Sequence, residues 1–223
     1  MNRFNVATCA MVAVMACTSS VLAGTYAVQS GGSILDGDNF FFLDVNGEGT
    51  SLLSVELQLS LTHDALTDVN VVLISPVGTA VTLFTTLPPP DPVYFEDVIF
   101  SDVPAAPRIA GSTTLEGGIL RYRGEFRPED IGQSMSAFVG ENPNTDGANR
   151  WTLRIFDSQS GLFGNLLSPG SGAPWNPQGL TAGTQLIITS NGVQTVVPEP
   201  VTLGLAVMSL TGVGLATLRR RHG

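Results

Sequence analysis

The chain has 223 residues and no lysine, and its ten arginines are outnumbered by nineteen acids, which gives a formal net charge of −9. Nucleic-acid binding needs a basic surface that displaces counterions, and the long stretch between the two ends of this chain carries none. The composition therefore excludes a nucleic-acid partner and disfavours anionic lipid surfaces, whereas acidic loops suit solubility or divalent cations.

The first 23 residues have the three parts of an export signal. Arg3 supplies the positive charge, Val6 to Cys17 form an apolar stretch, and Val21-Leu22-Ala23 is a small-residue cleavage site. We therefore predict a signal peptide over residues 1–23, removed before Gly24. The alternative is a lipoprotein signal, because Val14-Met15-Ala16-Cys17 partly resembles a lipobox that would make Cys17 the lipidated first residue.

The stretch from Gly24 to Val197 is predicted to be one domain. It is long enough to bury a core, and it has six arginines against eighteen acids, so its net charge is −12. If Gly24 is the first residue of the mature chain, both cysteines, Cys9 and Cys17, leave with the signal peptide. A cysteine nucleophile, a thiolate zinc site and an iron–sulfur cluster are thus excluded for the mature domain.

The hydrophobic pattern of this domain has a period of two. Val55, Leu57, Leu59 and Leu61 alternate with polar residues, and the same alternation starts at Trp151, which we expect to be buried. Clusters of Gly, Pro, Asp and Asn separate the strand-like segments. The remaining strand-like runs are Val69–Ser75, Ala80–Thr86, Ile119–Arg123 and Thr184–Ser190. We expect an all-β sandwich of the jelly-roll or Greek-key type, followed by one C-terminal transmembrane helix.

The C-terminal end predicts that helix. Eighteen uncharged residues run from Val201 to Leu218 and would span about 27 Å as a helix, close to the hydrocarbon thickness of a bilayer. Pro198 and Pro200 place the helix start at or after Pro200, and the arginine cluster marks the cytoplasmic end. That cluster consists of Arg219, Arg220 and Arg221.

Residues 198–223 resemble the PEP-CTERM sorting signal of exported bacterial proteins. The motif Pro198-Glu199-Pro200, the apolar span and the arginine cluster occur in the expected order. The resemblance implies that the segment is a temporary membrane anchor recognised by an exosortase, which processes the chain near the Pro-Glu-Pro motif.

A second resemblance concerns the domain itself. The run LSVELQLSLTHDALTDVNVVLISPVGT and the later run RPEDIGQSMSAFVGENPNTDGANRWTLRIFDSQSGLFGNL are similar to the P domain (P/Homo B) that follows subtilisin-like proprotein convertases. They cover about residues 50–190 and imply a compact eight-stranded jelly roll. The loop between His63 and Asp68 departs from that family's pattern, and the stretch from Gly24 to Ser51 is too short to hold the protease that this domain follows in the convertases.

Candidate catalytic residues are few. His63 is the sole histidine between Gly24 and Val197, and its neighbour Asp64 points to the opposite face of a strand, so we expect His63 to be bonded to the following loop. Carboxylate pairs of the kind that glycosidases use are available, but nothing selects one of them. These pairs are Glu96-Asp97, Glu129-Asp130 and Asp36 with Asp38.

Two binding hypotheses remain. Asp97, Asp102 and Asp157 are expected at strand ends and are candidate ligands of a structural calcium ion. Trp175, in a loop, is the candidate aromatic contact for a glycan. An EF-hand at Asp44 to Gly49 is disfavoured, because Val55 stands where a bidentate Glu is expected.

Together these features predict an exported, non-enzymatic protein. We expect a membrane-anchored precursor that exosortase processes, and a β-sandwich with a structural or adhesive role at the cell surface or in the extracellular polysaccharide matrix. The alternatives are a carbohydrate-binding module and a carboxylate-dependent hydrolase.

Overall fold

The computed structural model describes residues 20–192, apart from 86, 88–93, 110–113, 117–118, 130–131, 174–175 and 181. The chain divides into two compact units, Met1–Val193 and Gln194–Gly223, and every described residue belongs to the first. The sorting motif, the predicted helix and its three arginines lie outside the described residues, as does Trp175. No helix among the residues described is long and apolar enough to cross a membrane.

The described part of the chain forms fourteen strands and two short 3-10 helices. In chain order they are β1 Ser20–Ala27, β2 Gly32–Ile34, β3 Gly37–Leu43, β4 Ser51–His63, η1 Leu66–Asp68, β5 Val69–Ile74, β6 Ala80–Phe84, β7 Tyr94–Phe100, β8 Thr114–Glu116, β9 Ile119–Phe126, η2 Met135–Phe138, β10 Trp151–Asp157, β11 Gly164–Leu166, β12 Gly172–Ala173, β13 Asn176–Leu180 and β14 Gln185–Gly192. The all-β expectation is confirmed for these residues. The strand number exceeds the eight implied by the P-domain resemblance.

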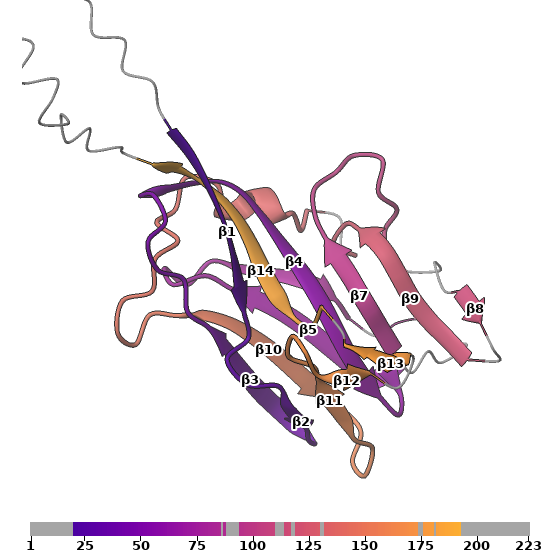
Figure 1. Ribbon diagram of the computed structural model, residues 1–223. Helices are drawn as coiled ribbons and strands as arrows, with labels where there is room; N and C mark the ends of the chain where they lie inside the picture. Colours follow the sequence, from indigo (N-terminus) through magenta and orange to yellow (C-terminus); the bar gives the residue numbers. More distant parts are fainter. Residues whose placement is uncertain are drawn as a thin grey trace, which may run out of the picture. The chain divides into compact units, whose positions relative to one another are not determined.

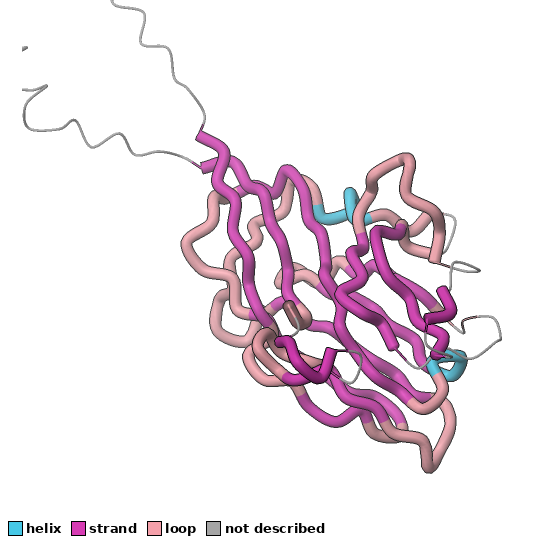
Figure 2. Tube along the Cα trace, turned by 45° about the vertical axis from the view of Figure 1, so that its right-hand side comes forward, coloured by secondary structure: helices cyan, strands magenta, loops and turns pink. Residues whose placement is uncertain are grey.

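The strands form two main sheets that face each other (Figure 1). The large sheet has the order β1-β14-β4-β7-β9-β8, with β11 pairing both β4 and β2, and the small sheet has the order β3-β10-β5-β6. The short strands β12 and β13 pair with each other. All named pairs are antiparallel except β7 with β9, so the large sheet is mixed. Figure 2 shows the same two layers of strands, joined mostly by loops.

Side-chain alternation explains which faces meet. Along β10, Trp151, Leu153, Ile155 and Asp157 are buried, and the residues between them are half-buried. The inward side chains of both sheets form one continuous core, which is what a two-layer sandwich needs to bury its apolar faces. Trp151 is fully buried, as expected, and its Nε1–H donates to the carbonyl of Pro143 at 2.8 Å. The ring meets Phe138 edge-on, with 5.1 Å between centroids.

The centre of β4 is buried on both faces. Gln58 and Ser60 point away from the core, yet both are buried, because the segment leading into β14 covers them. Gln58 Nε2 donates to the carbonyl of Gly183 at 3.2 Å, and the Thr184 hydroxyl donates to the Ser60 carbonyl at 3.1 Å. These bonds satisfy polar groups that would otherwise be buried without partners.

The strand β1 begins inside the predicted signal peptide. Ser20 to Ala23 pair with Gly192 to Thr189 of β14, and Gly24 to Ala27 continue the same ladder. Val21 is 61% exposed, so its side chain contributes little to the core. Cleavage after Ala23, which stays a prediction, would leave Gly24 to Ala27 as a shorter edge strand.

Candidate functional site

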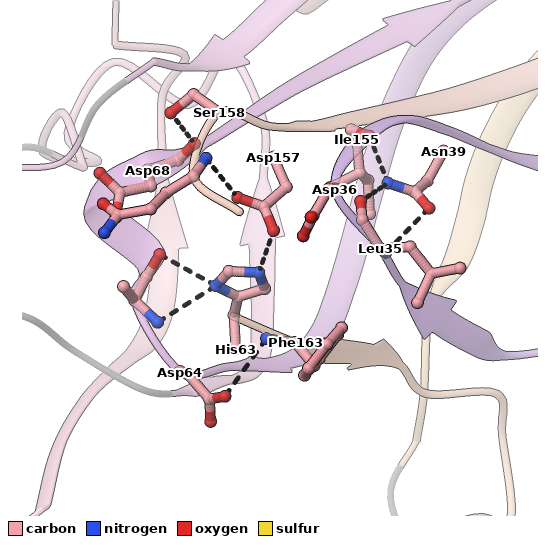
Figure 3. Close-up of polar contacts among 12 residues, drawn as sticks. Leu35, Asp36, Asn39, His63, Asp64, Asp68, Ile155, Asp157, Ser158 and Phe163 are labelled. Carbon is pink, nitrogen blue, oxygen red and sulfur yellow. Dashed lines mark hydrogen bonds and ion pairs between the residues drawn. The ribbon is translucent and has the colours of Figure 1, made fainter. Parts of the chain in front are cut away.

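The histidine of the domain lies at one end of the sandwich, as the last residue of β4. Its side chain is only 2% exposed and approaches Asp157, the last residue of β10, with His63 Nε2 3.1 Å from Asp157 Oδ2 (Figure 3). Both side chains are fully buried. His63 and Asp157 end strands that belong to different sheets, and the packing of the two sheets brings these strand ends together.

Both ring nitrogens of His63 have partners inside the protein. Nδ1 lies 3.1 Å from the amide nitrogen of Ala65 and 2.9 Å from its carbonyl oxygen. A neutral imidazole donates from Nε2 to Asp157 and accepts from the Ala65 N–H, whereas an imidazolium also donates from Nδ1 to the Ala65 carbonyl. The expectation that His63 is bonded to the following loop is confirmed. Neither nitrogen is free to take a proton from a substrate.

A glycine makes room for the imidazole. Gly164 of β11 pairs with His63, and a Cβ added at Gly164 would lie 2.5 Å from Cδ2 of the ring and 2.3 Å from the carbonyl oxygen of Thr62. Any other residue would therefore push the ring or the backbone of β4 away. The close packing of these two strands thus holds the imidazole against Asp157.

The loop after β10 is held by acidic residues around this pair. Asp157 Oδ1 accepts from the amide of Gln159 at 3.0 Å, and Asp64 Oδ2 accepts from the amide of Phe163 at 3.2 Å. The amide and the hydroxyl of Ser158 both donate to the carbonyl of Asp68, at 3.0 and 2.9 Å (Figure 3). Each of these groups accepts a hydrogen bond from the loop after β10, so the cluster fixes the conformation of that loop.

The three carboxylates of the calcium hypothesis are engaged by different partners. Asp97 lies within β7 rather than at its end, accepts from the hydroxyl of Ser60, and has a positive φ of 49° where the β7–β9 register shifts. Asp102 accepts from the amides of Met135 and Ser136 at the start of η2, and Asp157 binds His63. Among the described residues, no group of three or more His, Cys, Asp or Glu side chains could hold a metal ion. A calcium ion shared by these three residues therefore has no geometric basis here.

The candidate carboxylate pairs for hydrolysis have cationic or backbone partners. Glu96 bonds Arg121 at 2.7 Å and Arg123 at 3.2 Å, and Asp38 bonds Arg154 at 2.6 Å. Asp36 accepts from the amide of Gly161, and Glu129 from the amide of Thr85. Asp130 lies outside the described residues. Each of these acids that the structure describes bonds another part of the fold. Among the described residues they therefore offer no pair of unbonded carboxylates for hydrolysis.

The surface of the described region is hollowed in several places, and two of these hollows bear on the search for a site. The first, of about 330 Å³, lies between β4, the chain after β7 and η2, and its walls include Leu53, Val103 and Val139. The second, of about 440 Å³, is lined by glycines and small polar side chains near β11. Neither brings a histidine to its wall, and the acids of the first are Glu56 and the already bonded Asp102.

Comparison with known proteins supports the P-domain resemblance over part of the chain. The model of the proprotein convertase P-domain matches residues 52–115, which run from β4 to β8 and include His63. Asp157, the partner of His63, lies beyond the match. A comparison with curated proteins finds no match.

Two solved structures of one bacterial protein align with this chain. They are a serine protease of Aeromonas sobria in complex with its chaperone, at 16% identity, and the serine protease of Aeromonas sobria itself, at 15%. Both alignments have a TM-score of 0.38 and cover 78% of this chain. They cover 28% of the protease chain, so the present chain spans less than a third of that protein's length.

Proposed function

We propose that this chain is an exported bacterial surface or extracellular-matrix protein whose β-sandwich is a non-catalytic module. Its role is structural or adhesive within the extracellular polysaccharide layer. The matched P-domain residues support a module of this kind, because in proprotein convertases this domain is not the catalytic one. The export signal predicted over residues 1–23 and the resemblance of residues 198–223 to PEP-CTERM signals support the location.

The observation that carries the proposal is the state of His63. General-base catalysis needs an imidazole nitrogen within hydrogen-bond reach of the substrate proton. Here both ring nitrogens are bonded inside the protein, and the side chain is fully buried beside an equally buried Asp157. A Ser-His-Asp site would need this histidine, because it is the sole one in the mature domain.

Export and sorting are tested by mass. In the producing bacterium, the surface or secreted form is expected to lack residues 1–23 and to end near Pro198-Glu199-Pro200. A surface product that still carries Arg219 to Arg221, in a strain with a working exosortase, would contradict the processing. A product found in the cytoplasm would contradict export as well.

Absence of catalysis is tested separately. Purified protein incubated with polysaccharide released from the producing strain is expected to generate no new reducing ends. Turnover that is lost in Glu96→Gln or Glu129→Gln would favour the carboxylate-dependent hydrolase. Turnover lost in His63→Gln while the free energy of unfolding stays unchanged would contradict the structural role of the buried pair.

A further inference from the structure

The outward face of the small sheet carries two exposed aromatic side chains, Phe40 and Phe42. Residues at every second position of β3 and β10 point away from the core, and the ladder sets Phe42 beside Thr152 and Phe40 beside Arg154. On the other side of β10, Thr152 faces Ile74 and Arg154 faces Val72 of β5. We call this surface the outer face; it is made of Asp38, Phe40, Phe42, Thr152, Arg154, Phe156, Val72 and Ile74.

Two phenylalanines of the outer face are open to solvent. Phe40 is 52% exposed and Phe42 is 42% exposed, although aromatic side chains gain most by burial. Phe41, between them, packs against the core. One aromatic side chain of β3 therefore contributes to the core, and the two beside it point to solvent. Exposed apolar surface gathered in one place is typical of an interaction site.

Tethered arginines accompany these rings. The guanidinium carbon of Arg150 lies 4.8 Å from the centroid of Phe42, and Arg150 Nε donates to Asp44 at 2.5 Å. Arg154, opposite Phe40, donates from Nε to Asp38 at 2.6 Å, and this hydrogen bond raises the pKa of Arg154 above its usual value. Fixed groups lose little conformational freedom when a ligand binds.

Charge and size restrict what can cover this face. The domain from Gly24 to Val197 has a net charge of −12, which opposes a second copy or an anionic polymer, whereas the Asp38–Arg154 pair leaves the face itself nearly neutral. Four strands about 4.8 Å apart and five to seven residues long make a face of roughly 400 Å². A stable protein interface takes about 800 Å² from each partner. A small, uncharged ligand surface fits better than a protein.

We propose that the outer face binds a neutral polysaccharide, with Phe40 and Phe42 as the platform for its sugar rings. The inference rests on the proposed function, because it names the ligand of the adhesive module. One face of a pyranose ring consists of C–H groups, and these pack on the electron-rich face of an aromatic ring. Asp38 accepts from sugar hydroxyls and Arg154 donates to them, so the flat face offers both kinds of polar contact.

Affinity electrophoresis of the purified full chain tests the proposal. Native gels contain a soluble mixed-linkage β-glucan, a xylan, a galactomannan or a dextran, with alginate as the anionic comparison. We expect at least one neutral polysaccharide to retard the protein and alginate not to do so. The double variant Phe40→Ala/Phe42→Ala is expected to lose affinity on the order of tenfold or more.

Matched variants separate binding from folding. Phe163→Ala removes a phenylalanine that is 55% exposed but lies in the loop before β11, so its retardation should equal that of the wild type. Phe40→Tyr/Phe42→Tyr keeps both rings and should retain binding. Unfolding curves of all variants in urea identify any loss of retardation that comes from misfolding.

Three results would overturn the proposal. The first is that no neutral polysaccharide retards the protein, and the second is that the double alanine variant is retarded as much as the wild type. The third is a dimer in sedimentation that the double variant abolishes, because the outer face would then join two copies of the chain. Immunolabelling of the producing cells keeps the proposed function apart. A double variant that stays at the surface but no longer binds refutes neither statement, whereas wild type confined to the cytoplasm refutes the proposed function even if the gel shows binding.

Discussion

Two regions of this molecule, the end of β4 and the outer face of the small sheet, differ in which side chains they bury, and the difference is the opposite of that found in an active site. At the end of β4 the titratable pair His63 and Asp157 is buried and every polar atom described there has a partner. On the outer face of the small sheet, Phe40 and Phe42 are exposed. An active site exposes its titratable groups and buries its apolar ones. The comparison teaches that this histidine–aspartate pair serves the fold, whereas the small sheet presents aromatic side chains to solvent.

Breaking the buried pair of His63 and Asp157 is expected to reduce stability the most. Asp157→Ala leaves the imidazole of His63 without its carboxylate and the amide of Gln159 without its acceptor, so we expect the free energy of unfolding to fall by about 3–5 kcal/mol. Urea unfolding of the full chain measures the change. Asp64→Ala, which removes an exposed bond to the same loop, is the matched control and should cost about 1 kcal/mol or less. A loss for Asp157→Ala no greater than for the control would mean that the pair is not structural.

Alkaline pH tests two tyrosines, the buried Tyr122 and the partly buried Tyr26. Burial, and then the nearby charge of Glu129, raise the pKa of Tyr122 to about 12, and burial with a hydrogen bond to Glu48 does the same for Tyr26. The unfolded chain has the ordinary value of 10.0, so the stability these groups contribute is complete below pH 10 and falls as the pH rises toward 12. We expect a loss on the order of 2 kcal/mol, mostly from the buried Tyr122 because solvent screens the partly exposed Tyr26, followed by unfolding and by tyrosinate absorbance.

The matched variant for this prediction is Tyr122→Phe. The hydroxyl of Tyr122 is buried and has no hydrogen-bond partner among the described residues, while its ring stacks on Phe95 at 5.1 Å. Removing the hydroxyl should therefore leave the neutral-pH stability nearly unchanged and reduce the alkaline loss. An unchanged alkaline loss in this variant would assign the effect to other groups.

A smaller effect is expected at the start of η2. Asp102 accepts from the Ser134 hydroxyl at 2.7 Å and from the Met135 amide at 2.9 Å, which is the role of an N-terminal cap although it comes from a distant loop. Asp102→Ala should reduce the free energy of unfolding by about 1–2 kcal/mol, and Asp102→Asn by less, because an amide oxygen can still accept. If millimolar calcium stabilises the wild type and not Asp102→Ala, the carboxylate is a metal ligand instead.

The smallest effect on stability is expected on the outer face. Phe40→Ala and Phe42→Ala remove rings that are about half exposed, so each should change the free energy of unfolding by less than about 1 kcal/mol. Trp151→Ala, which removes a fully buried ring, provides the contrast at about 3–5 kcal/mol. Equal losses at Phe40 and Trp151 would show that the exposed phenylalanines belong to the core and would end the comparison.

Much of the fold could be predicted from the pattern of residues. The alternation at Val55 to Leu61 and at Trp151 to Phe156 appears as β4 and β10, and the runs at Val69, Ala80, Ile119 and Thr184 appear as β5, β6, β9 and β14. The strand β3 was missed, because Phe40-Phe41-Phe42-Leu43 is apolar at every position and so shows no period of two. Its aromatic composition was the available signal.

The candidate site was less predictable. His63 was expected at a strand end with bonds to its loop, and both were found. Its carboxylate partner was not expected, because Asp157 was grouped with Asp97 and Asp102 as a calcium ligand. Nothing local relates residues 94 positions apart, whereas the neighbours of Asp102 and Asp97 in space are set by the loop after β7 and by the register shift in that strand.

The sequence by itself determined that this domain is built of strands, which follows from the period of two along the chain. Its composition determined that the domain is acidic, has no thiol after Cys17 and contains a single histidine. Only the tertiary structure decided that His63 meets Asp157 and that Phe40 and Phe42 face outward. Periodicity assigns residues to alternate faces of a strand, but the pairing of strands and the packing of sheets choose the neighbours and decide which face is covered.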